Sequence, residues 1–542
     1  MSSSPSTRFS LTRRHFLAGS AALAVLPPVL RAGPAAAATA PLEIVAERRI
    51  IDVGGRAAPV FRLAGPGGRP GIVLEPGAPF RAVVKNRTGQ PTIIHWHGQT
   101  PPPEQDGVTD TGFAGLIADG GEATYDFAPR TGTHWMHSHH GLQEQSLLAA
   151  PMIVKSADDA RLDAEDVVVL LSDFSFRTPE EILAGLGGSM NHGSMAGGGA
   201  AMPGMDHGTA GSGMADSGMA GMNMAGMNHD GMSTGGMSMD GMDHGGMDLG
   251  SMASGGMASG GMDHGGMPMG GMAGTMDLND VAYDAFLAND RTLADPQVVR
   301  LERNGRVRLR IINGASATNF HIDLGPLAGS LIAVDGNPVV PLTGSRFPLA
   351  LGQRIDLLVT PPAGACAVFA VREGDKARTG IVLATPGAAI PRLAETADAV
   401  SPPLDAGFEA RLSPAAGGVA ADEARPLEAT LGGAMMPYRW TINGAIWQDR
   451  KALPVTARTT ARVTFANRTG MSHPMHLHGH HFQVVAIDGR PLAGAMRDTV
   501  LVAPGSTVTV AFAADNPGRW LLHCHNLYHM ASGMMTEVAY AA

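Results

Sequence analysis

Near its end the chain reads Trp520-Leu-Leu-His523-Cys524-His525-Asn-Leu-Tyr-His529-Met530-Ala-Ser-Gly-Met534. This stretch combines one thiol, three imidazoles and two thioethers. If residues 521–525 form a strand, successive side chains point to opposite faces, so His523 and His525 share a face that excludes Cys524. One short segment can therefore serve two metal sites, which are joined through the covalent bonds around Cys524.

The residues Cys524, His529 and Met534 match three of the four ligands of an electron-transfer copper. A thiolate and a thioether are soft enough to hold Cu(I), and a distorted site lets the metal cycle between oxidation states. The flanking His523 and His525 would face a second site made of histidines. The stretch therefore predicts a conducting path between two copper sites.

Further histidines occur in pairs with one residue between them, each within a strand-like stretch. They are His95 and His97, His137 and His139, and His476 and His478. On a strand, both imidazoles of such a pair project from one face, which suits metal binding by a rigid frame. With the pair at 523 and 525, eight histidines can close around one cluster only if the domains that carry them meet. His473 is left to complete the separate copper site of Cys524.

The rest of the chain favours β-sandwiches. It has 542 residues, 72 glycines and 38 prolines, and short alternating apolar runs such as 80–84, 307–312 and 462–466 lie between turns. Such a pattern is typical of sandwiches, and the length exceeds one hydrophobic core. We therefore expect an all-β chain of three consecutive sandwich domains. Their predicted ranges are 41–157, 158–395 and 431–542, with residues 396–430 as a linker and the middle domain as a spacer without metal.

The first 40 residues have the features of an export signal. Thr12-Arg13-Arg14-His15-Phe16-Leu17 precedes an apolar run to residue 30 and a small-residue stretch at 35–40. This is a twin-arginine signal peptide, which addresses folded protein for export, and it is too short and interrupted to span a membrane. We expect cleavage before Pro41, a periplasmic location and no membrane span elsewhere.

The predicted mature chain is acidic. Removal of residues 1–40 takes away four arginines and no acid, so the formal charge of −10 becomes −14. An acidic protein without basic clusters is a poor partner for nucleic acid or anionic membranes. We expect a monomer that interacts with small molecules.

Residues 187–276 differ from the rest of the chain in composition. They contain 21 methionines, five histidines and seven aspartates, with no lysine, arginine, glutamate or aromatic residue. This composition cannot bury enough apolar surface to form a core, so we expect a disordered insertion in the second domain. Thioethers suit Cu(I) and the Asp-His pairs suit Cu(II), which predicts additional labile copper on this segment. The alternative is a flexible insertion that a surface loop tolerates.

Two other residues have structural interpretations. Cys366 lies in an apolar run and is predicted to be a buried core thiol, so no disulfide is expected. His321 is solitary and is predicted to pack or to cap rather than to bind metal.

Together, these motifs resemble the multicopper oxidases with three cupredoxin domains, over nearly the whole mature chain. The resemblance implies Greek-key sandwiches and four coppers, namely one type 1, one type 2 and a type 3 pair. It implies that His95 and His476 bind the type 2 copper. The implied type 3 ligands are His97, His137, His139, His478, His523 and His525, and the implied type 1 ligands are His473, Cys524, His529 and Met534.

The resemblance also implies the reaction, which is four one-electron oxidations at type 1, transfer through Cys524 and reduction of O2 to water. Asp106, eleven residues after His95, matches an acid of the family that supplies protons. The alternative for Asp106 is an Asp-Gly turn. Some cuprous oxidases have another acid directly after the position of His529, where this chain has Met530. The additional histidines near the ligands, expected to be supporting or channel residues, are His134, His140, His480 and His481.

Residues 132–145 and 527–534 look like those of periplasmic copper-resistance oxidases. This predicts a detoxifying enzyme in which Cu(I), captured by the methionine-rich segment, is oxidised with O2 as acceptor. A laccase that oxidises phenols or aromatic amines is an alternative, because the ligands do not set the substrate. A copper-sequestering protein without turnover is a further alternative. A two-domain nitrite reductase is excluded because it lacks the eight-histidine set.

Overall fold

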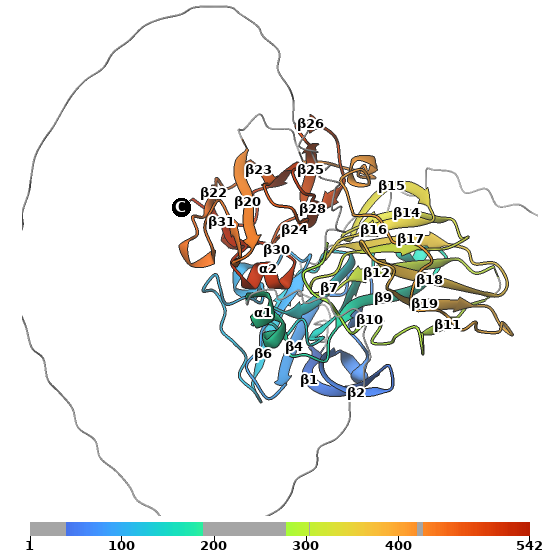
Figure 1. Cartoon of the computed structure of the whole chain (residues 1–542). Coiled ribbons are helices and arrows are strands. Elements are labelled where there is room, and N and C mark those ends of the chain that lie inside the picture. Colours follow the sequence, from blue (N-terminus) through green and yellow to red (C-terminus); the bar gives the residue numbers. More distant parts are fainter. Residues whose placement is uncertain (1–39, 188–277, 303, 420–425, 542) are drawn as a thin grey trace, which may run out of the picture. The chain divides into compact units, whose positions relative to one another are not determined.

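The structure is a computed structural model that describes residues 40–187, 278–302, 304–419 and 426–541 (Figure 1). The predicted signal peptide, apart from Ala40, and residues 188–276 of the predicted insertion lie outside the described residues. No helix in the described ranges is both long and apolar enough to cross a membrane.

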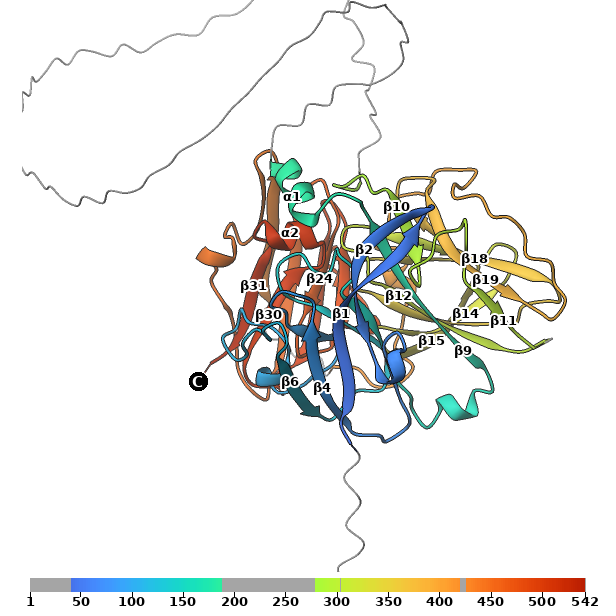
Figure 2. The same cartoon turned by 90° about the horizontal axis from the view of Figure 1, so that it is seen from below.

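The first sandwich consists of two sheets that face each other across an apolar core (Figure 2). One sheet has the order β2 (Arg56–Ala64), β1 (Leu42–Val53), β4 (Phe80–Arg87), β6 (Glu122–Phe127). The other has the order β3 (Ile72–Leu74), β8 (Ala149–Val154), β7 (Gly132–Ser138), β5 (Ile94–His97). In β4, Phe80, Ala82 and Val84 are buried while Arg81 is exposed, as the alternation of the sequence predicts.

The middle sandwich has a larger pair of sheets. One has the order β10 (Ala285–Ala288), β9 (Glu165–Phe174), β12 (Val307–Asn313), β17 (Arg354–Val359), β14 (Gly329–Val334), β15 (Asn337–Gly344). The other has the order β11 (Val298–Arg300), β19 (Arg378–Ala384), β18 (Ala365–Arg372), β13 (Phe320–Asp323), β16 (Arg346–Leu349). Strand β12 is buried on both faces, because Leu309 faces the core while Arg308 and Arg310 form ion pairs on the other side.

The third sandwich completes the described chain. One sheet has the order β21 (Tyr438–Ile442), β20 (Leu427–Met435), β23 (Thr460–Asn467), β29 (Thr507–Ala513), β25 (Phe482–Ile487), β26 (Arg490–Pro491), and β27 (Met496–Arg497) also pairs with β25. The other has the order β22 (Leu453–Val455), β31 (Met535–Tyr540), β30 (Arg519–Cys524), β24 (His473–Leu477), β28 (Thr499–Val502). Strand β20 begins inside the stretch predicted as the linker.

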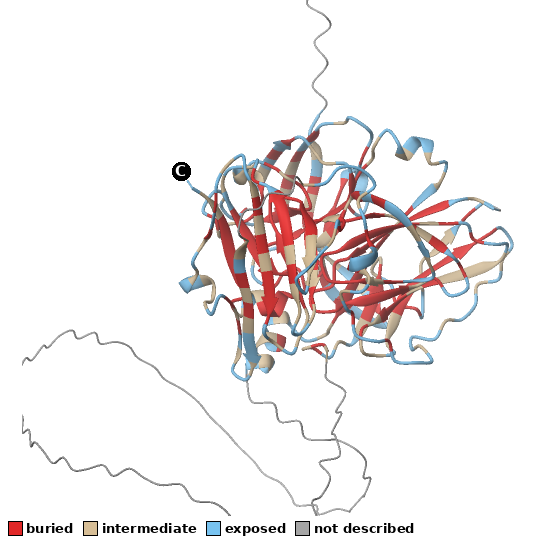
Figure 3. Ribbon diagram, turned by 90° about the horizontal axis from the view of Figure 1, so that it is seen from above, coloured by how far each residue is buried: buried red, intermediate tan, exposed pale blue. Residues whose placement is uncertain are grey.

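Helices are short. The two α-helices are α1 (Pro179–Gly187) and α2 (Leu527–Ala531) in the described part of the chain, which also has the 3-10 turns η1 (Pro66–Gly68), η2 (Pro103–Gln105), η3 (Asp159–Arg161), η4 (Glu409–Arg411) and η5 (Trp447–Asp449). Buried residues run along the strands and exposed ones lie mainly in loops and turns (Figure 3). The predicted all-β chain of three sandwiches is confirmed, whereas the residue boundaries between its domains stay predictions.

The prediction that Cys366 is a buried core thiol is wrong, because its side chain is half-buried. Residues 365–367 at the start of β18 are all partly exposed, and full burial begins at Val368. The thiol packs against the edge of the middle core, beyond its buried centre.

Candidate metal centres

The strand registers bring the histidine pairs toward each other. In the first sandwich, His95 on β5 lies opposite His137 on β7. In the third, His476 on β24 lies opposite His523 on β30. Directly opposed residues of antiparallel strands have Cβ atoms about 4.5–5.5 Å apart, so each register brings two of the histidine pairs together.

All eight histidines of the four pairs converge, and all are buried. Their ring nitrogens form groups of three within 4.8 Å of one another. The groups are His95, His97 and His476; His97, His137 and His525; and His139, His478 and His523. Each group combines the first and third sandwiches, so the two domains meet at this eight-histidine cluster.

The ring nitrogens that face the cluster fit a set of metal ions. Buried polar atoms are nearly always hydrogen-bonded. Among the described residues, however, six of these imidazoles have a buried nitrogen with no hydrogen-bond partner. These nitrogens are Nε2 of His95, His137, His139 and His476, Nδ1 of His97, and both ring nitrogens of His525. Converging imidazole nitrogens suit copper, which accounts for atoms that are otherwise unsatisfied.

For several of these histidines the opposite ring nitrogen faces an oxygen acceptor, which fixes the ring orientation and tautomer of a metal-binding histidine. The Nδ1 atoms of His95 and His476 donate to the carbonyl oxygens of Asp106 and Asp498, each at 2.9 Å. Nδ1 of His137 lies 2.8 Å from a carboxylate oxygen of Glu144. His97 is reversed, because its Nε2 faces the Asp498 carboxylate at 3.1 Å and leaves Nδ1 for the cluster.

Burial keeps six of these imidazoles neutral. It lowers the pKa of His523 to about 3. It also holds the pKa of other cluster histidines well below the usual value, namely His97, His139, His476, His478 and His525. Neutral imidazole is the form that binds a metal.

A second group, termed here the Cys524 centre, consists of His473, Cys524 and His529. The Cys524 sulfur lies 3.7 Å from Nδ1 of each histidine, and the two Nδ1 atoms are 3.1 Å apart. Burial raises the pKa of the Cys524 thiol, so a metal is needed to hold it as the thiolate ligand. Met534 is buried in the same core, and its carbonyl accepts a hydrogen bond from the Cys524 amide at 3.1 Å.

The two centres lie on opposite sides of one strand, as the alternation predicts. His523 and His525 belong to the eight-histidine cluster, while Cys524 between them belongs to the other centre. Strand β30 extends from Arg519 to Cys524, so it ends one residue earlier than the stretch considered in the sequence.

Asp106 lies against the cluster. One oxygen of its carboxylate accepts a hydrogen bond from Nδ1 of His478 at 2.9 Å. The other has no hydrogen-bond partner among the described residues and lies 3.4 Å from Nδ1 of His95. The Asp-Gly turn is also present, because Gly107 has a φ of +80° and a side chain there would overlap the Ile94 carbonyl. Asp106 therefore combines the turn with a contact to the site.

The additional histidines are absent from the metal-sized groups in the described residues. His480 contacts the Tyr540 hydroxyl at 2.6 Å, His481 donates to the Gly98 carbonyl at 2.8 Å, and His134 faces the Thr131 carbonyl at 3.2 Å. His140 lines a cavity of about 380 Å³ beside α1. His321 donates to the Pro402 carbonyl at 2.9 Å, in agreement with the predicted capping role.

Sequence reasoning missed several charged residues beside the centres. Asp498 and Glu144 face cluster histidines, Arg354 pairs with Asp498, and Asp280 lies 2.7 Å from Nε2 of His529. Glu144 follows His139 by five residues in Gln143-Glu144-Gln145, a local signal that could have indicated it. The others are distant in sequence from the histidines that they contact and have no comparable signal.

Comparison with known proteins agrees with this geometry. Three family models, each described as multicopper oxidase, match residues 47–159, 264–390 and 421–542, together more than half of the chain. The multicopper oxidase MmcO of Mycobacterium tuberculosis is 29% identical over 461 residues, which cover 84% of this chain and 78% of the relative. Copper resistance protein A of Escherichia coli is 26% identical over 583 residues, with coverages of 87% and 88%.

Among solved structures, the McoA multicopper oxidase of Aquifex aeolicus superposes with a TM-score of 0.60 and 21% identity, covering 93% of this chain and 96% of that one. This likeness shows the fold. The family matches, the cupredoxin-like sandwiches and the two buried centres lead to one conclusion: this chain belongs to the multicopper oxidases.

Proposed function

We propose that this oxidase converts Cu(I) to Cu(II) at the Cys524 centre, with O2 as the electron acceptor. We further propose that it acts in copper tolerance in the periplasm, after export by the twin-arginine route. The signal-like N-terminal sequence and the similarity to copper resistance protein A support this assignment.

Four coppers fit the two centres. His473, Cys524, His529 and Met534 would hold the type 1 copper, and His95 and His476 the type 2 copper. The six remaining cluster histidines would hold the type 3 pair, namely His97, His137, His139, His478, His523 and His525. Copper at these positions supplies one-electron redox chemistry and a site for O2.

The protein residues provide the connection and the protons. Cys524 is bonded through the backbone to His523 and His525, so the shortest covalent path between the centres is the strand itself. Reduction of O2 to two waters takes up four protons. Two carboxylates are positioned to transfer them: Asp106, one oxygen of which has no hydrogen-bond partner among the described residues, and Glu144, 2.8 Å from His137.

Asp280 marks the side from which the reductant approaches. Its buried carboxylate lies 2.7 Å from Nε2 of His529 and accepts a hydrogen bond from the Tyr438 hydroxyl. An oxygen ligand beside the outer nitrogen of His529 attracts a cation. Cu(I) bound there would be separated from the Cys524 centre by one imidazole ring.

The attachment of the methionine-rich segment is the observation that carries the proposal. Helix α1 ends at Gly187, and the described chain resumes at Leu278, two residues before Asp280. Ile182 from one end and Val281 from the other belong to a single apolar cluster with Leu527 and Tyr528 of α2. The described residues on either side of the segment thus pack against the helix that contains His529, and Figure 1 shows α1 beside α2.

A tethered metal-binding segment presents its cargo at a high effective concentration to a nearby site. Copper collected by its 21 methionines would therefore remain close to Asp280 and His529. A tolerated loop insertion has no need of this composition at this position.

O2 uptake by the copper-loaded protein tests the proposal, with Cu(I) and a phenol supplied separately as reductants. Three proteins are compared: the unaltered chain, a deletion of residues 188–277, and a chain of equal length in which the methionines of that segment become glutamine. We expect fast uptake with Cu(I) only for the unaltered chain. The variant with glutamines shows whether a loss of activity in the deletion comes from the missing thioethers or from the shorter chain.

Other outcomes select the alternatives. Phenol-dependent uptake that is equal in all three proteins, without Cu(I) turnover, would identify a laccase-like oxidase. No uptake with either reductant, combined with copper binding, would identify a sequestering protein. In that case Cys524→Ser would leave copper tolerance unchanged.

A further inference from the structure

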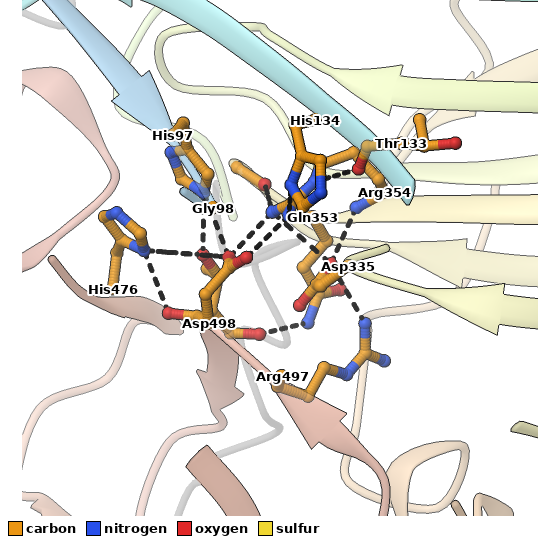
Figure 4. Close-up of polar contacts among 12 residues, drawn as sticks. His97, Gly98, Thr133, His134, Asp335, Gln353, Arg354, His476, Arg497 and Asp498 are labelled. Atoms are coloured by element: carbon orange, nitrogen blue, oxygen red, sulfur yellow. Dashed lines mark hydrogen bonds and ion pairs between the residues drawn. The ribbon is translucent and has the colours of Figure 1, made fainter. Parts of the chain in front are cut away.

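The middle sandwich reaches the surroundings of the eight-histidine cluster through Arg354, the first residue of β17, which binds Asp498 beside the cluster. Its guanidinium is fully buried and donates to both carboxylate oxygens of Asp498, with N–O distances of 2.7 and 2.5 Å (Figure 4). Its Nε atom donates to the Thr133 carbonyl at 3.0 Å. Thr133 lies on β7 and Asp498 directly precedes β28, so one side chain joins all three sandwiches.

Asp498 in turn orients one histidine from each cluster-bearing domain. Its carboxylate oxygen Oδ1 accepts from Nε2 of His97 at 3.1 Å, and its carbonyl oxygen accepts from Nδ1 of His476 at 2.9 Å. The Thr499 hydroxyl donates to the same Oδ1 atom at 2.9 Å. The two histidines consequently direct different ring nitrogens at the cluster, Nδ1 of His97 and Nε2 of His476.

The reversed orientation of His97 requires a fixed acceptor at Nε2. An aspartate can rotate about its side-chain bonds, but a two-pronged guanidinium holds both oxygens in one plane. Arg354 is therefore the group that keeps Oδ1 of Asp498 directed at His97.

The surrounding backbone is shaped to fit this arrangement. A side chain at Gly98, directly after His97, would overlap the Arg354 guanidinium and lie 2.8 Å from Oδ2 of Asp498. A side chain at Gly352, two residues before Arg354, would lie 2.8 Å from the His525 ring. Both positions have a positive φ, +85° and +74°, which favours glycine.

Further charged residues contact Arg354 or its neighbours on the side away from the cluster. The Asp335 carboxylate accepts from the Arg354 amide at 2.8 Å and lies 3.4 Å from Nη1 of Arg497. Arg497 pairs with Glu409 at 2.8 Å. This row of alternating charges leads away from the cluster. Of its two arginines, Arg354 is the one that binds a residue in contact with the cluster histidines.

We propose that the middle domain takes part in building the eight-histidine cluster through Arg354, a positioning residue that fixes Asp498 and thereby the orientations of His97 and His476. The proposal rests on the ligand roles given to these histidines under the proposed function and is independent of the reductant. It replaces the expectation that this domain is only a spacer.

The test compares Arg354→Lys and Asp498→Asn with Arg308→Lys in the copper-loaded protein. Lysine keeps the charge of Arg354 but cannot bind both carboxylate oxygens, and asparagine keeps the shape of Asp498. Arg308 is a matched control, because it is nearly buried on β12 of the same sheet and binds Asp356 through two nitrogens at 3.1 and 2.6 Å, without a contact to the cluster. Copper per chain, the blue thiolate absorption and the electron paramagnetic resonance signal of the type 2 copper are measured.

We expect Arg354→Lys and Asp498→Asn to weaken copper binding at the cluster about 10–100-fold, the usual effect of losing a group that orients a metal ligand. The type 2 signal should change while the blue absorption of the Cys524 centre persists. Arg308→Lys should keep both signals. If Arg354→Lys gives no soluble protein, Asp498→Asn provides the same comparison.

Equal cluster copper and unchanged type 2 signals in Arg354→Lys and Arg308→Lys would overturn the inference. His97→Ala serves as the reference for the ligand set. If His97→Ala loses cluster copper and Arg354→Lys does not, the positioning role alone is wrong. If His97→Ala also keeps its copper, the ligand assignment itself is wrong.

Discussion

Individual carboxylates at the two centres have different partners, and these partners determine what each substitution changes. Asp106 touches a histidine of the cluster, whereas Asp280 touches the outer nitrogen of a histidine in the Cys524 centre. Both carboxylates are buried. Changing either aspartate to asparagine therefore removes a negative charge at a place where little solvent can compensate for its loss.

Asp106→Asn should slow O2 reduction about 100-fold or more, since a positioned proton-transfer group contributes roughly 10²–10⁴-fold. Asparagine retains the size of the side chain and an oxygen for His478. The blue absorption of the Cys524 centre should be unchanged, and that centre should still be reduced by Cu(I) in the absence of O2. Steady-state O2 uptake measures O2 reduction, and loss of the blue absorption without O2 measures reduction of the Cys524 centre by Cu(I). Normal O2 uptake by Asp106→Asn would show that Asp106 does not transfer protons to O2.

Asp280→Asn should affect the oxidation of Cu(I) and leave the reduction of O2 unchanged. The carboxylate is the proposed oxygen ligand for Cu(I), and a charged contact contributes about 1.5–3 kcal/mol, so kcat/KM for Cu(I) should fall by roughly 10–100-fold. Reoxidation of the reduced enzyme by O2 should keep its rate. Stopped-flow recovery of the blue colour checks this, and a loss confined to reoxidation would contradict the assignment.

At the scale of elements, the short helix α2 positions His529. Five residues form little more than one turn, so the helix depends on its cap. The Asn526 side chain accepts hydrogen bonds from the amides of Tyr528 and His529 at 3.1 and 3.2 Å. The same amides would otherwise be buried without partners.

Asn526→Ala should destabilise this turn by about 1 kcal/mol, the usual effect of removing a helix N-cap. Since His529 lies on the turn, the Cys524 centre should lose its blue absorption at a lower denaturant concentration than in the unaltered protein. Asn526→Ser restores a capping oxygen and should recover most of the loss. Identical midpoints for all three proteins would show that packing of Leu527 and Tyr528 alone holds the helix.

At the scale of the whole molecule, the copper cluster lies between two domains. Histidines on or directly after β5 and β7 in the first sandwich share each group with histidines on or directly after β24 and β30 in the third. Metal binding therefore couples the docking of these domains to the occupancy of the cluster.

Removal of copper by a chelator should lower the unfolding temperature, and reloading should restore it. A ligand at 100 times its Kd stabilises the folded state by about 2.7 kcal/mol per site. His476→Ala should lose the part of this shift that comes from the cluster while keeping the blue Cys524 centre. Scanning calorimetry of loaded and stripped protein measures the shift, and equal unfolding temperatures would show that docking is independent of copper.

Local sequence patterns predicted the fold class and the donor atoms. Alternation along strands indicates which side chains share a face, so it separated Cys524 from His523 and His525 and grouped the other histidines into pairs. The apolar run around Cys366 wrongly predicted a buried thiol, because such a run does not show how close a residue lies to the end of the core.

The sequence by itself determined the candidate ligands and their division between two groups, because strand periodicity acts over a few residues. Only the tertiary structure decided what holds those ligands. His97 and Asp498 are 401 positions apart, and Arg354 and Asp498 are 144 apart. Such contacts arise from the docking of whole sandwiches, which buries Arg354 of the middle domain and Asp498 of the third beside His97 of the first. No local pattern encodes that geometry.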